Sequence, residues 1–521
     1  MNSPGATRLA AALGVSIFVV WAALGLPGRF PDPEELNALV GARALLDGQP
    51  LPPWLGTLTR YEGGSWLIAA PLSLLLALGL EGVAATGTLA LISAALGVAL
   101  ASVWAGRVAG APAALLTGPL LAFGCRPLAT FATVGTGGTT DFLFALPLFA
   151  LVGERWKAGD RSHAGVAALG LLAGAAAAAS FAHLATAAVL GLLVLHAARP
   201  STRVRTAASF AAAAAVFPLG WLLAVGGGEL RPPTLRDGRG GGDLLSALFP
   251  PRLGSWLADL PAAIGGRTAD PPAFDRFAAT TLAVLLVIAC LDAARQPGPR
   301  RRAATAAGLL ALAATAGPGL TNVPADLVRY SLPAIATALV LAATRPPLGV
   351  AVLAVGLALG PPPVPLIAPG SPDDGAMALG LLYAEVREPA THQHERARAV
   401  LARLPTQHHS ALVFGHGVRS GTRLQHLMTA PPETWAGWRF GGAASWLAGP
   451  SPAHRDAWLQ GLGAGLAQGG VTPLERLFLG LATPADRADL NVGLGLPGDA
   501  PTASLAAARL DVLRPRLELA P

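Results

Sequence analysis

Long apolar runs separated by short polar connections fill most of the first 366 residues of the chain. A helix needs about 20 apolar residues to cross the hydrocarbon core of a bilayer, so such runs predict membrane-spanning helices. The pattern therefore predicts an all-α polytopic membrane protein with about 12–13 transmembrane helices. The runs that are long enough, or nearly so, are residues 9–26, 64–80, 83–105, 111–125, 139–153, 163–179, 181–198, 204–226, 277–294, 303–317, 328–344 and 347–366.

Composition and charge agree with a membrane protein and orient it. The chain has 53 % hydrophobic and 13 % charged residues and a mean hydropathy of +0.52, too apolar for a soluble protein of this size. Its net charge of +7 comes almost wholly from arginine. Because basic residues in short connections mark the cytoplasmic side, we expect the clusters at Arg199–Arg205 and Arg295–Arg302 inside. The loop at about 227–276 and everything after residue 366 are then expected outside.

The same composition bears on location and partners. The bias toward Ala, Gly, Arg and Pro is typical of a GC-rich bacterial genome, so we expect a multi-pass protein of the bacterial inner membrane. The basic charge is explained by membrane topology, and we expect no nucleic-acid partner. Cys125 and Cys290 each lie in or beside an apolar run, so they are expected to be packing residues rather than a disulfide or a metal site.

The front half of the chain conflicts with this topology by one crossing. If the N-terminus is inside, the four runs from residue 64 to 153 return the chain to the outside, whereas the basic turn at 154–161 requires the inside. The segment Arg126–Gly138 is too short and too rich in Gly and Thr for an ordinary span, but it could be a broken element buried among helices. Thirteen crossings would then place the C-terminus outside.

Beyond residue 370 the apolar runs shorten and polar residues become frequent. We therefore predict two domains: a membrane domain at 1–369, with a first outer loop at 27–63, and a soluble, mainly helical domain outside the cytoplasm at 370–521. Pairs of glycines recur loosely in the second domain and suggest stacked helices. Its histidines lack acidic or cysteine partners, so we expect them to be exposed to solvent; we expect no cofactor, with a divalent metal left open. These histidines are His392, His394, His408, His409 and His416.

An acidic segment follows the first apolar run. Asp32 suits a helix N-cap, Pro33 suits the first helical position and Glu35 suits the third, so the letters predict a short helix that starts with a capping box. Acids in a first helical turn are favoured by the helix dipole even without chemistry. The segment alone therefore leaves a structural and a catalytic interpretation open.

The spacing within this segment resembles that of the C-type glycosyltransferases, membrane enzymes related to protein O-mannosyltransferases and aminoarabinose transferases. Their first outer loop has an Asp-Glu pair followed by Ala-Arg, leucines and Gly. Two positions depart from the family: Glu34 stands where the family usually has Asp, and Ala38 stands where it has an aromatic residue. Asp32 could instead supply the base. The matching residues are Glu34-Glu35, Ala42-Arg43, Leu45-Leu46 and Gly48.

Shorter matches follow along the chain to about residue 345. Tyr61-Glu62 and the preceding Arg60 open the second apolar run, Asp141 begins a later run, and Arg329-Tyr330 with Pro333 is similar to a motif at the outer end of a late helix. The resemblance implies a transferase that moves a sugar from a polyprenyl-phosphate donor to a lipid, glycan or protein acceptor on the outer face. It implies catalytic roles for Asp32, Glu34 and Glu35, and substrate-binding roles for Arg329, Tyr330, Asp141, Glu62 and Tyr61. Arg60 is a further candidate for the positive charge that the leaving phosphate needs.

Two other functional classes remain open. A transporter or flippase for lipid-linked sugars would concentrate acids and glycine breaks inside its spans, whereas here the acids cluster in the first outer loop, which favours an enzyme. A non-catalytic assembly protein could keep the membrane part without the chemistry. The departures at Glu34 and Ala38 keep that alternative open.

Overall fold

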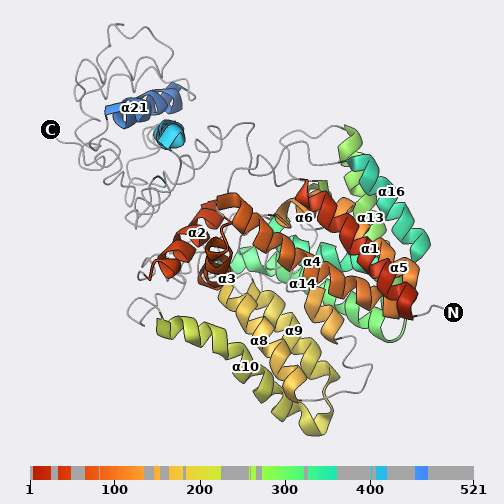
Figure 1. The fold of residues 1–521 in the computed structure, drawn as a ribbon. Coiled ribbons are helices and arrows are strands. Elements are labelled where there is room, and N and C mark those ends of the chain that lie inside the picture. The colour runs from red at the N-terminus through yellow and green to blue at the C-terminus, as the bar shows by residue number, and fades with distance from the viewer. Residues whose placement is uncertain are drawn as a thin grey trace, which may run out of the picture. The chain divides into compact units, whose positions relative to one another are not determined.

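The computed structural model describes a set of separate ranges of the chain (Figure 1). All the secondary-structure elements within these ranges are helices. The described residues are 4–24, 33–48, 65–80, 82–133, 146–152, 163–179, 183–224, 257, 260–265, 273–321, 327–360, 401, 406–418 and 452–467.

The predicted apolar runs form helices close to the expected positions, so the prediction of an all-α polytopic membrane protein is confirmed. Three helical stretches in the described ranges are long and apolar enough to cross a membrane by themselves: Pro4–Ala23, Ala84–Ala109 and Ala273–Arg295. The helices are α1 (Pro4–Ala23), α2 (Pro33–Leu46), α3 (Ser65–Ala77), α4 (Gly82–Ala109), α5 (Ala111–Phe123), α6 (Arg126–Phe131), α8 (His163–Ala179), α9 (His183–Ala197), α10 (Arg203–Ala224), α13 (Ala273–Arg295), α14 (Pro299–Thr321), α15 (Leu327–Ala343), α16 (Pro346–Leu359) and α21 (Pro452–Ala467).

Two compact units make up the chain. One contains residues 1–27 and 41–366, and the other contains residues 28–40 and 367–521. The predicted boundary at residue 369 marks where the membrane domain ends. The division into two units does not test that position, so the boundary stays a prediction.

α1 and α5 lie side by side and run in the same direction (Figure 1). A Cβ atom on Gly118 of α5 would clash with the backbone of Gly14 of α1, so the two glycines allow the close approach of the helices. Further along both helices, the rings of Trp21 and Phe123 lie 4.7 Å apart between centroids. The two helices therefore begin at one end of the bundle and finish at the other.

The neighbouring helices can be oriented in the same way. Gly106, near the end of α4, lies against Thr7 near the start of α1, so α4 runs antiparallel to α1. Gly356, near the end of α16, lies against the backbone of Phe123 at the end of α5, so α16 runs parallel to α5. The start of α1, the α4–α5 connection and the start of α16 thus share one end of the bundle.

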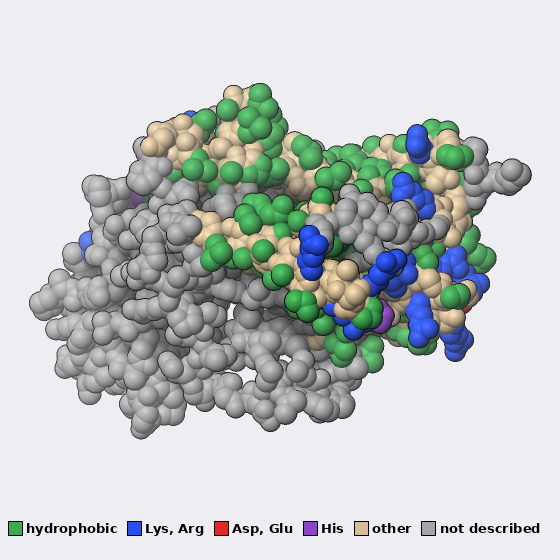
Figure 2. Space-filling view, turned by 90° about the horizontal axis from the view of Figure 1, so that it is seen from below, with side chains coloured by type: hydrophobic (Ala, Val, Ile, Leu, Met, Phe, Trp, Pro, Cys, Tyr) green, Lys and Arg blue, Asp and Glu red, His purple; other side chains and the backbone are tan. Residues whose placement is uncertain are grey.

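Arginine side chains gather at this end, which we call the basic end. The α13–α14 turn belongs to it, because Arg300 donates a hydrogen bond to the carbonyl oxygen of Thr344 (2.8 Å) and Arg345 forms an ion pair with Asp292, with Nε to Oδ2 at 2.6 Å. Figure 2 shows many Lys and Arg side chains on one side of the face it displays. The helix directions place at this end Arg8, Arg107, Arg295, Arg300, Arg301, Arg302 and Arg345.

The helix directions also bear on the missing crossing. Since α4 ends at the basic end, it begins at the opposite end, and α3 precedes it by a turn of a few residues. α1 finishes at that same opposite end, so the chain makes an even number of crossings between α1 and α4, and α3 need not be one of them. If α3 does not cross, the basic turn at 154–161 comes out inside without a crossing in Arg126–Gly138. Residues 126–131 of that segment form the short helix α6. The directions thus favour eleven crossings over thirteen, and both counts predict an outside C-terminus.

A second group of helices packs on residues 146–152. α8 and α10 run parallel, because Gly170 and Gly174 of α8 lie against the backbone at Phe210 and Ala214 of α10, forty residues later in each case. Their close approach again depends on the absence of a side chain. The buried cluster that joins residues 146–152 to α8 and α9 consists of Leu148, Val152, Val166, Leu169, Ala173, Leu190 and Val194.

In the second unit, the helix at 409–418 packs on α21. Gly417 lies against Trp458, and Gly461 lies against Phe414, as expected for glycines that let helices approach. The prediction that His416 is exposed to solvent is wrong: His416 is 1 % exposed, and its Nδ1 accepts a hydrogen bond from the indole nitrogen of Trp458 (3.2 Å). Histidine is frequently buried when a neighbour can satisfy its ring, and the apolar residues around position 416 were the overlooked signal.

The prediction for the cysteines is confirmed for Cys125. Cys125 is buried between α5 and α6, and Cys290 is half-buried in α13; both are free thiols. His409, also predicted to be exposed, is half-buried, and its ring lies 5.6 Å from that of His454 between centroids. The predictions for His392, His394 and the side chain of His408 lie outside the described residues.

Candidate functional site

The acidic segment enters helix α2 as the sequence predicts. Pro33 is the first residue of α2, so Glu34 and Glu35 are its second and third residues. The two residues belong to the first turn, where free backbone amides favour acidic residues. At the other end, Gly48 adopts φ of 66°, a conformation that favours glycine, and closes the helix. The glycine of the family-like motif therefore has a local structural role.

One face of α2 is buried and carries small residues. Ala38 and Ala42 are separated by one helical turn, and both are fully buried. On the exposed side, Arg43 pairs with Asp47 across a turn at 3.8 Å. An aromatic side chain at position 38 would need space that the packing does not provide. The burial of this position therefore gives a physical reason for the departure at Ala38 from the family pattern.

Arg329 and Tyr330 lie in the first helical turn of α15, as the third and fourth residues of Leu327–Ala343. Pro333 has no amide hydrogen, so the carbonyl oxygen of Arg329 receives no bond from it. The hydroxyl of Thr337 donates a hydrogen bond to the carbonyl oxygen of Pro333 (2.7 Å). Because the end of α15 adjoins the start of α16 at the basic end, its first turn faces the opposite end, to which α1 also leads.

The convergence of the predicted site residues stays a prediction. The side chains of Glu34, Glu35, Arg329 and Tyr330 are not among those the structure describes. The remaining candidates, Asp32, Arg60, Tyr61, Glu62 and Asp141, lie outside the described residues altogether.

Arg126 forms a polar centre that sequence reasoning missed. It is the first residue of α6 and is only 7 % exposed. Its Nη1 donates to Asp275 Oδ2 at 2.8 Å and to the carbonyl oxygen of Gly265 at 3.2 Å. Its Nε donates to the carbonyl oxygen of Gly360 at 3.1 Å, and its Nη2 donates to the carbonyl oxygen of Leu359. One guanidinium thus joins the starts of α6 and α13, the end of α16 and the helical residues 260–265.

The chemistry of this centre explains why a charge can be buried there. The last carbonyl groups of a helix lack intrahelical partners and carry partial negative charge, and Arg126 satisfies two of them at the end of α16. Asp275 supplies the compensating charge, as a buried cation requires. The only sequence signal was an arginine between Cys125 and Pro127 in an otherwise apolar stretch, which we read as part of a broken segment.

The Arg126 centre lies at the end of the bundle opposite to the basic end. α5 and α16 both finish there, and α1 finishes beside α5 before the chain enters the acidic segment. The guanidinium is occupied by protein acceptors, so its role is to hold helix ends in place rather than to bind substrate. Among the described residues, no group of three or more His, Cys, Asp or Glu side chains could hold a metal ion.

The helices and their apolar lengths define an all-α polytopic membrane protein. No protein-family model matches the chain, and no curated protein matches it. A search of solved structures finds ArnT from Cupriavidus metallidurans in the apo state, with 17 % sequence identity and a TM-score of 0.46, over 93 % of this chain and 84 % of that chain.

Proposed function

We propose that the protein is an integral-membrane glycosyltransferase that moves a sugar from a polyprenyl-phosphate donor to an acceptor on the outer face of the membrane. The observation that carries the proposal is the placement of the family-like motif on one helix directly after the first span. α2 begins at Pro33, carries Glu34 and Glu35 in its first turn, buries Ala42 and ends before Gly48. The spacing of the motif thus corresponds to a defined structural unit.

The reaction needs two kinds of group. The hydroxyl or amine of the acceptor attacks the anomeric carbon, and a carboxylate must take its proton; we assign this role to Asp32 or Glu34, with Glu35 beside them. The bond to the lipid phosphate breaks, and fixed positive charge must stabilise the phosphate that leaves. We assign this role to Arg329, with Tyr330, Asp141, Glu62, Tyr61 and Arg60 as further substrate-binding residues.

Helix directions support the outer-face placement. The first turn of α15 and the end of α1 share the end opposite to the arginine cluster, and arginine-rich connections mark the cytoplasmic side. The proposed base and the proposed phosphate ligand would then act on the same side of the membrane. The domain at 370–521 would lie on that side and help to hold the acceptor.

The experiment compares carboxylate variants in a glycosyl-transfer assay. Asp32→Asn and Glu34→Gln are measured beside Glu62→Gln, which removes an acid that is expected to contact substrate without taking the proton. A general base contributes 10²–10⁴-fold, so at least one loop variant should lose about a hundredfold or more in kcat. If neither loses more than tenfold, the assignment of the base is wrong.

A second set of variants tests the phosphate ligand. Arg329→Lys keeps the charge but loses the planar pair of donors, so it should weaken use of the donor, and Arg329→Ala should weaken it further. Arg43→Lys and Arg43→Ala are matched controls, because Arg43 pairs with Asp47 on an exposed helix face. Unchanged apparent donor affinity in both Arg329 variants would remove Arg329 from the site.

A further inference from the structure

α6 (Arg126–Phe131) is too short to keep its place by itself. A helix of six residues gains too little from its own hydrogen bonds to be stable alone, so its position depends on the groups that bind it. Leu128 and Phe131 are buried in the bundle. Arg126, the first residue, is hydrogen-bonded to α13, to the end of α16 and to residues 260–265. Its side chain thus attaches α6 to three elements that lie far away in the sequence.

α6 in turn lies beside a helix that carries a proposed transferase residue. It contacts α15 and α1 as well as α5, which precedes it. Gly124, between α5 and α6, lies against the side chain of Leu339 of α15, with which a Cβ atom on Gly124 would clash. Arg329 lies ten residues from Leu339 toward the other end of α15, about 15 Å along the helix at 1.5 Å per residue. The place of the α5–α6 junction therefore bears on the place of Arg329.

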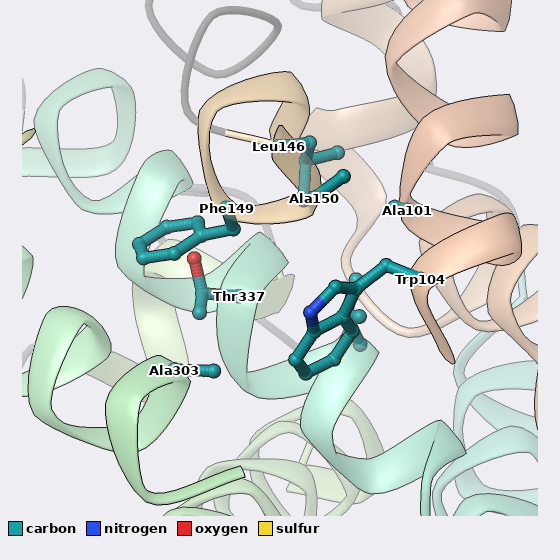
Figure 3. A pocket seen from close by; sticks show the side chains of 8 residues that line it. Ala101, Trp104, Leu146, Phe149, Ala150, Ala303 and Thr337 are labelled. Atoms are coloured by element: carbon teal, nitrogen blue, oxygen red, sulfur yellow. The ribbon is translucent and has the colours of Figure 1, made fainter. Parts of the chain in front are cut away.

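A small unfilled space borders α15 on another side. Thr337 and Val340 line this apolar pocket, and Figure 3 shows Thr337 beside it together with Trp104 and Phe149. Successive residues of a helix are rotated by about 100°, so Leu339 points about 200° away from Thr337. α15 thus packs closely on the α5–α6 junction with one face and borders the pocket with the opposite face. The pocket leaves room for a small shift of α15 if the junction moves.

The end of α15 is held separately at the basic end. There Arg300 donates a hydrogen bond to the carbonyl oxygen of Thr344, directly after α15, at 2.8 Å. Arg329 lies 15 residues from Thr344, whereas Leu339 lies 5 residues from it. A helix that pivots about Thr344 moves Arg329 about three times as far as Leu339. A small shift at the α5–α6 junction is therefore enlarged at the first turn of α15.

We propose that Arg126 is a positioning residue for Arg329: it holds α6, and through α6 it sets where the first turn of α15 lies, without contacting the substrate itself. This inference rests on the proposed function, in which Arg329 stabilises the lipid phosphate that leaves. A misplacement of about 1 Å far from the chemistry can cost on the order of a hundredfold in rate. Loss of the contacts of Arg126 should therefore lower kcat even in protein that stays folded.

A distance measurement tests the positioning without any transfer reaction. Spin labels are attached to the full-length protein at Leu24→Cys, which replaces an exposed residue directly after α1, and at Val328→Cys, in the first turn of α15. Cys290 is replaced by alanine, and the fully buried Cys125 stays. Electron–electron double resonance then gives the distribution of distances between the labels.

The informative variant is Arg126→Lys, which keeps a positive charge but loses the planar donors that reach four acceptors. It should shift or broaden the distribution. Gly174→Ala is the matched control, because its Cβ would clash with the backbone of Ala214 in the α8–α10 packing, away from α6; it should leave the distribution unchanged. An unchanged distribution in Arg126→Lys, or the same change in both variants, would overturn the inference.

A double-mutant cycle in the glycosyl-transfer assay tests the consequence for the reaction. At a temperature where the protein stays folded, Arg126→Lys alone should lower kcat about tenfold or more. In the Arg329→Ala background the same change should cost much less, because the residue that Arg126 positions is gone. Two residues that act independently would give the same factor in both backgrounds. Equal factors would therefore contradict a positioning role.

Leu128→Ala separates positioning from a direct contact with the substrate. Leu128 is fully buried in α6 and carries no charge, so the cavity left by this change should let α6 shift and should reproduce the loss in kcat. This loss should also shrink in the Arg329→Ala background. A loss that occurs in Arg126→Lys alone, together with a raised KM for the donor, would show that Arg126 binds the donor and would overturn the inference.

The inference and the proposed function fail separately. If the wild type transfers no sugar, the proposed function fails, and the label distances still decide whether Arg126 sets the place of the first turn of α15. If the wild type transfers sugar while the distances and kcat do not respond to Arg126→Lys, the function stands and the inference fails. Asp275→Asn, which removes only the ion pair of Arg126, replaces Arg126→Lys in both tests if that variant does not fold.

Discussion

Replacement of Arg126 should destabilise the membrane unit far more than replacement of any exposed arginine. In Arg126→Ala, the carboxylate of Asp275, which is 19 % exposed, keeps its charge but loses its partner. The carbonyl oxygens of Leu359, Gly360 and Gly265 lose their donors at the same time. Breaking a buried ion pair on one side costs about 3–5 kcal/mol.

A second ion pair, at the basic end of the bundle, supplies the matched control. Arg345 forms an ion pair with both oxygens of Asp292, but the two side chains are 45 % and 29 % exposed. Water screens such pairs, which contribute about 0–1 kcal/mol. Arg345→Ala should therefore have little effect, although both variants remove an arginine that pairs with one aspartate.

The assay is thermal unfolding of the purified protein in detergent, followed by the loss of the monodisperse peak in size-exclusion chromatography. With an unfolding entropy of ~2.1 cal/mol/K per residue, the unit of residues 1–27 and 41–366 shifts by about 1–2 °C per kcal/mol. Arg126→Ala should therefore lower the midpoint by about 5 °C, and Arg345→Ala by about 1 °C or less. Arg126→Lys should fall between them, because a lysine ammonium cannot reach four acceptors in the plane of a guanidinium. Equal shifts in Arg126→Ala and Arg345→Ala would refute the reasoning.

Three further outcomes follow from packing, charge and topology. Gly174→Leu should lower the unfolding midpoint in the same assay, because the new side chain would meet the backbone of Ala214, whereas Gly308→Ala should be neutral or slightly stabilising since nothing lies within 4 Å of its Cβ; equal loss in both would contradict the α8–α10 packing. The pKa of His454 is lowered by burial and by the charge of His409, so the unfolded chain binds more protons, and the stability of the second unit should decrease as pH falls below about 6.5. Circular dichroism melts should show a smaller pH dependence in His454→Gln, and an unchanged dependence would exclude this contribution. A reporter fused after Pro521 should be active only outside the cytoplasm, and activity inside would overturn the proposed orientation.

The positions of the helices could be predicted because each apolar run is long and is bounded by charges, glycine or proline. α8, α13 and α15 begin and end within a few residues of the expected runs. The number of crossings could not be predicted, because hydropathy alone does not show whether an apolar helix such as α3 crosses the membrane. The direction of α4, fixed by the contact between Gly106 and Thr7, supplied that information.

The candidate site likewise has features that could be predicted from the sequence and features that could not. The start of α2 at Pro33 follows from local capping rules, and Gly48 ends the helix for a reason that is visible in its backbone angle. The Arg126 centre could not be predicted, because its acceptors come from positions more than 130 residues away: Gly265 and Asp275 on one side, and Leu359 and Gly360 on the other. The burial of His416 could have been suspected from the apolar residues around it, but its partner Trp458 could not, because Trp458 lies 42 residues further along the chain.

The measurement that tests the proposed function most directly is transfer from a lipid-linked donor. Full-length protein is reconstituted into proteoliposomes with polyprenyl-phosphate sugars labelled in the sugar and with membrane extract as acceptor. We predict that the label leaves the lipid and enters the acceptor fraction with wild-type protein, and that the double variant Asp32→Asn, Glu34→Gln loses this transfer while it retains the wild-type elution profile. Label that stays on the lipid with every donor sugar, or transfer that continues at the same rate in the double variant, would contradict a glycosyltransferase with its base in the segment after the first span.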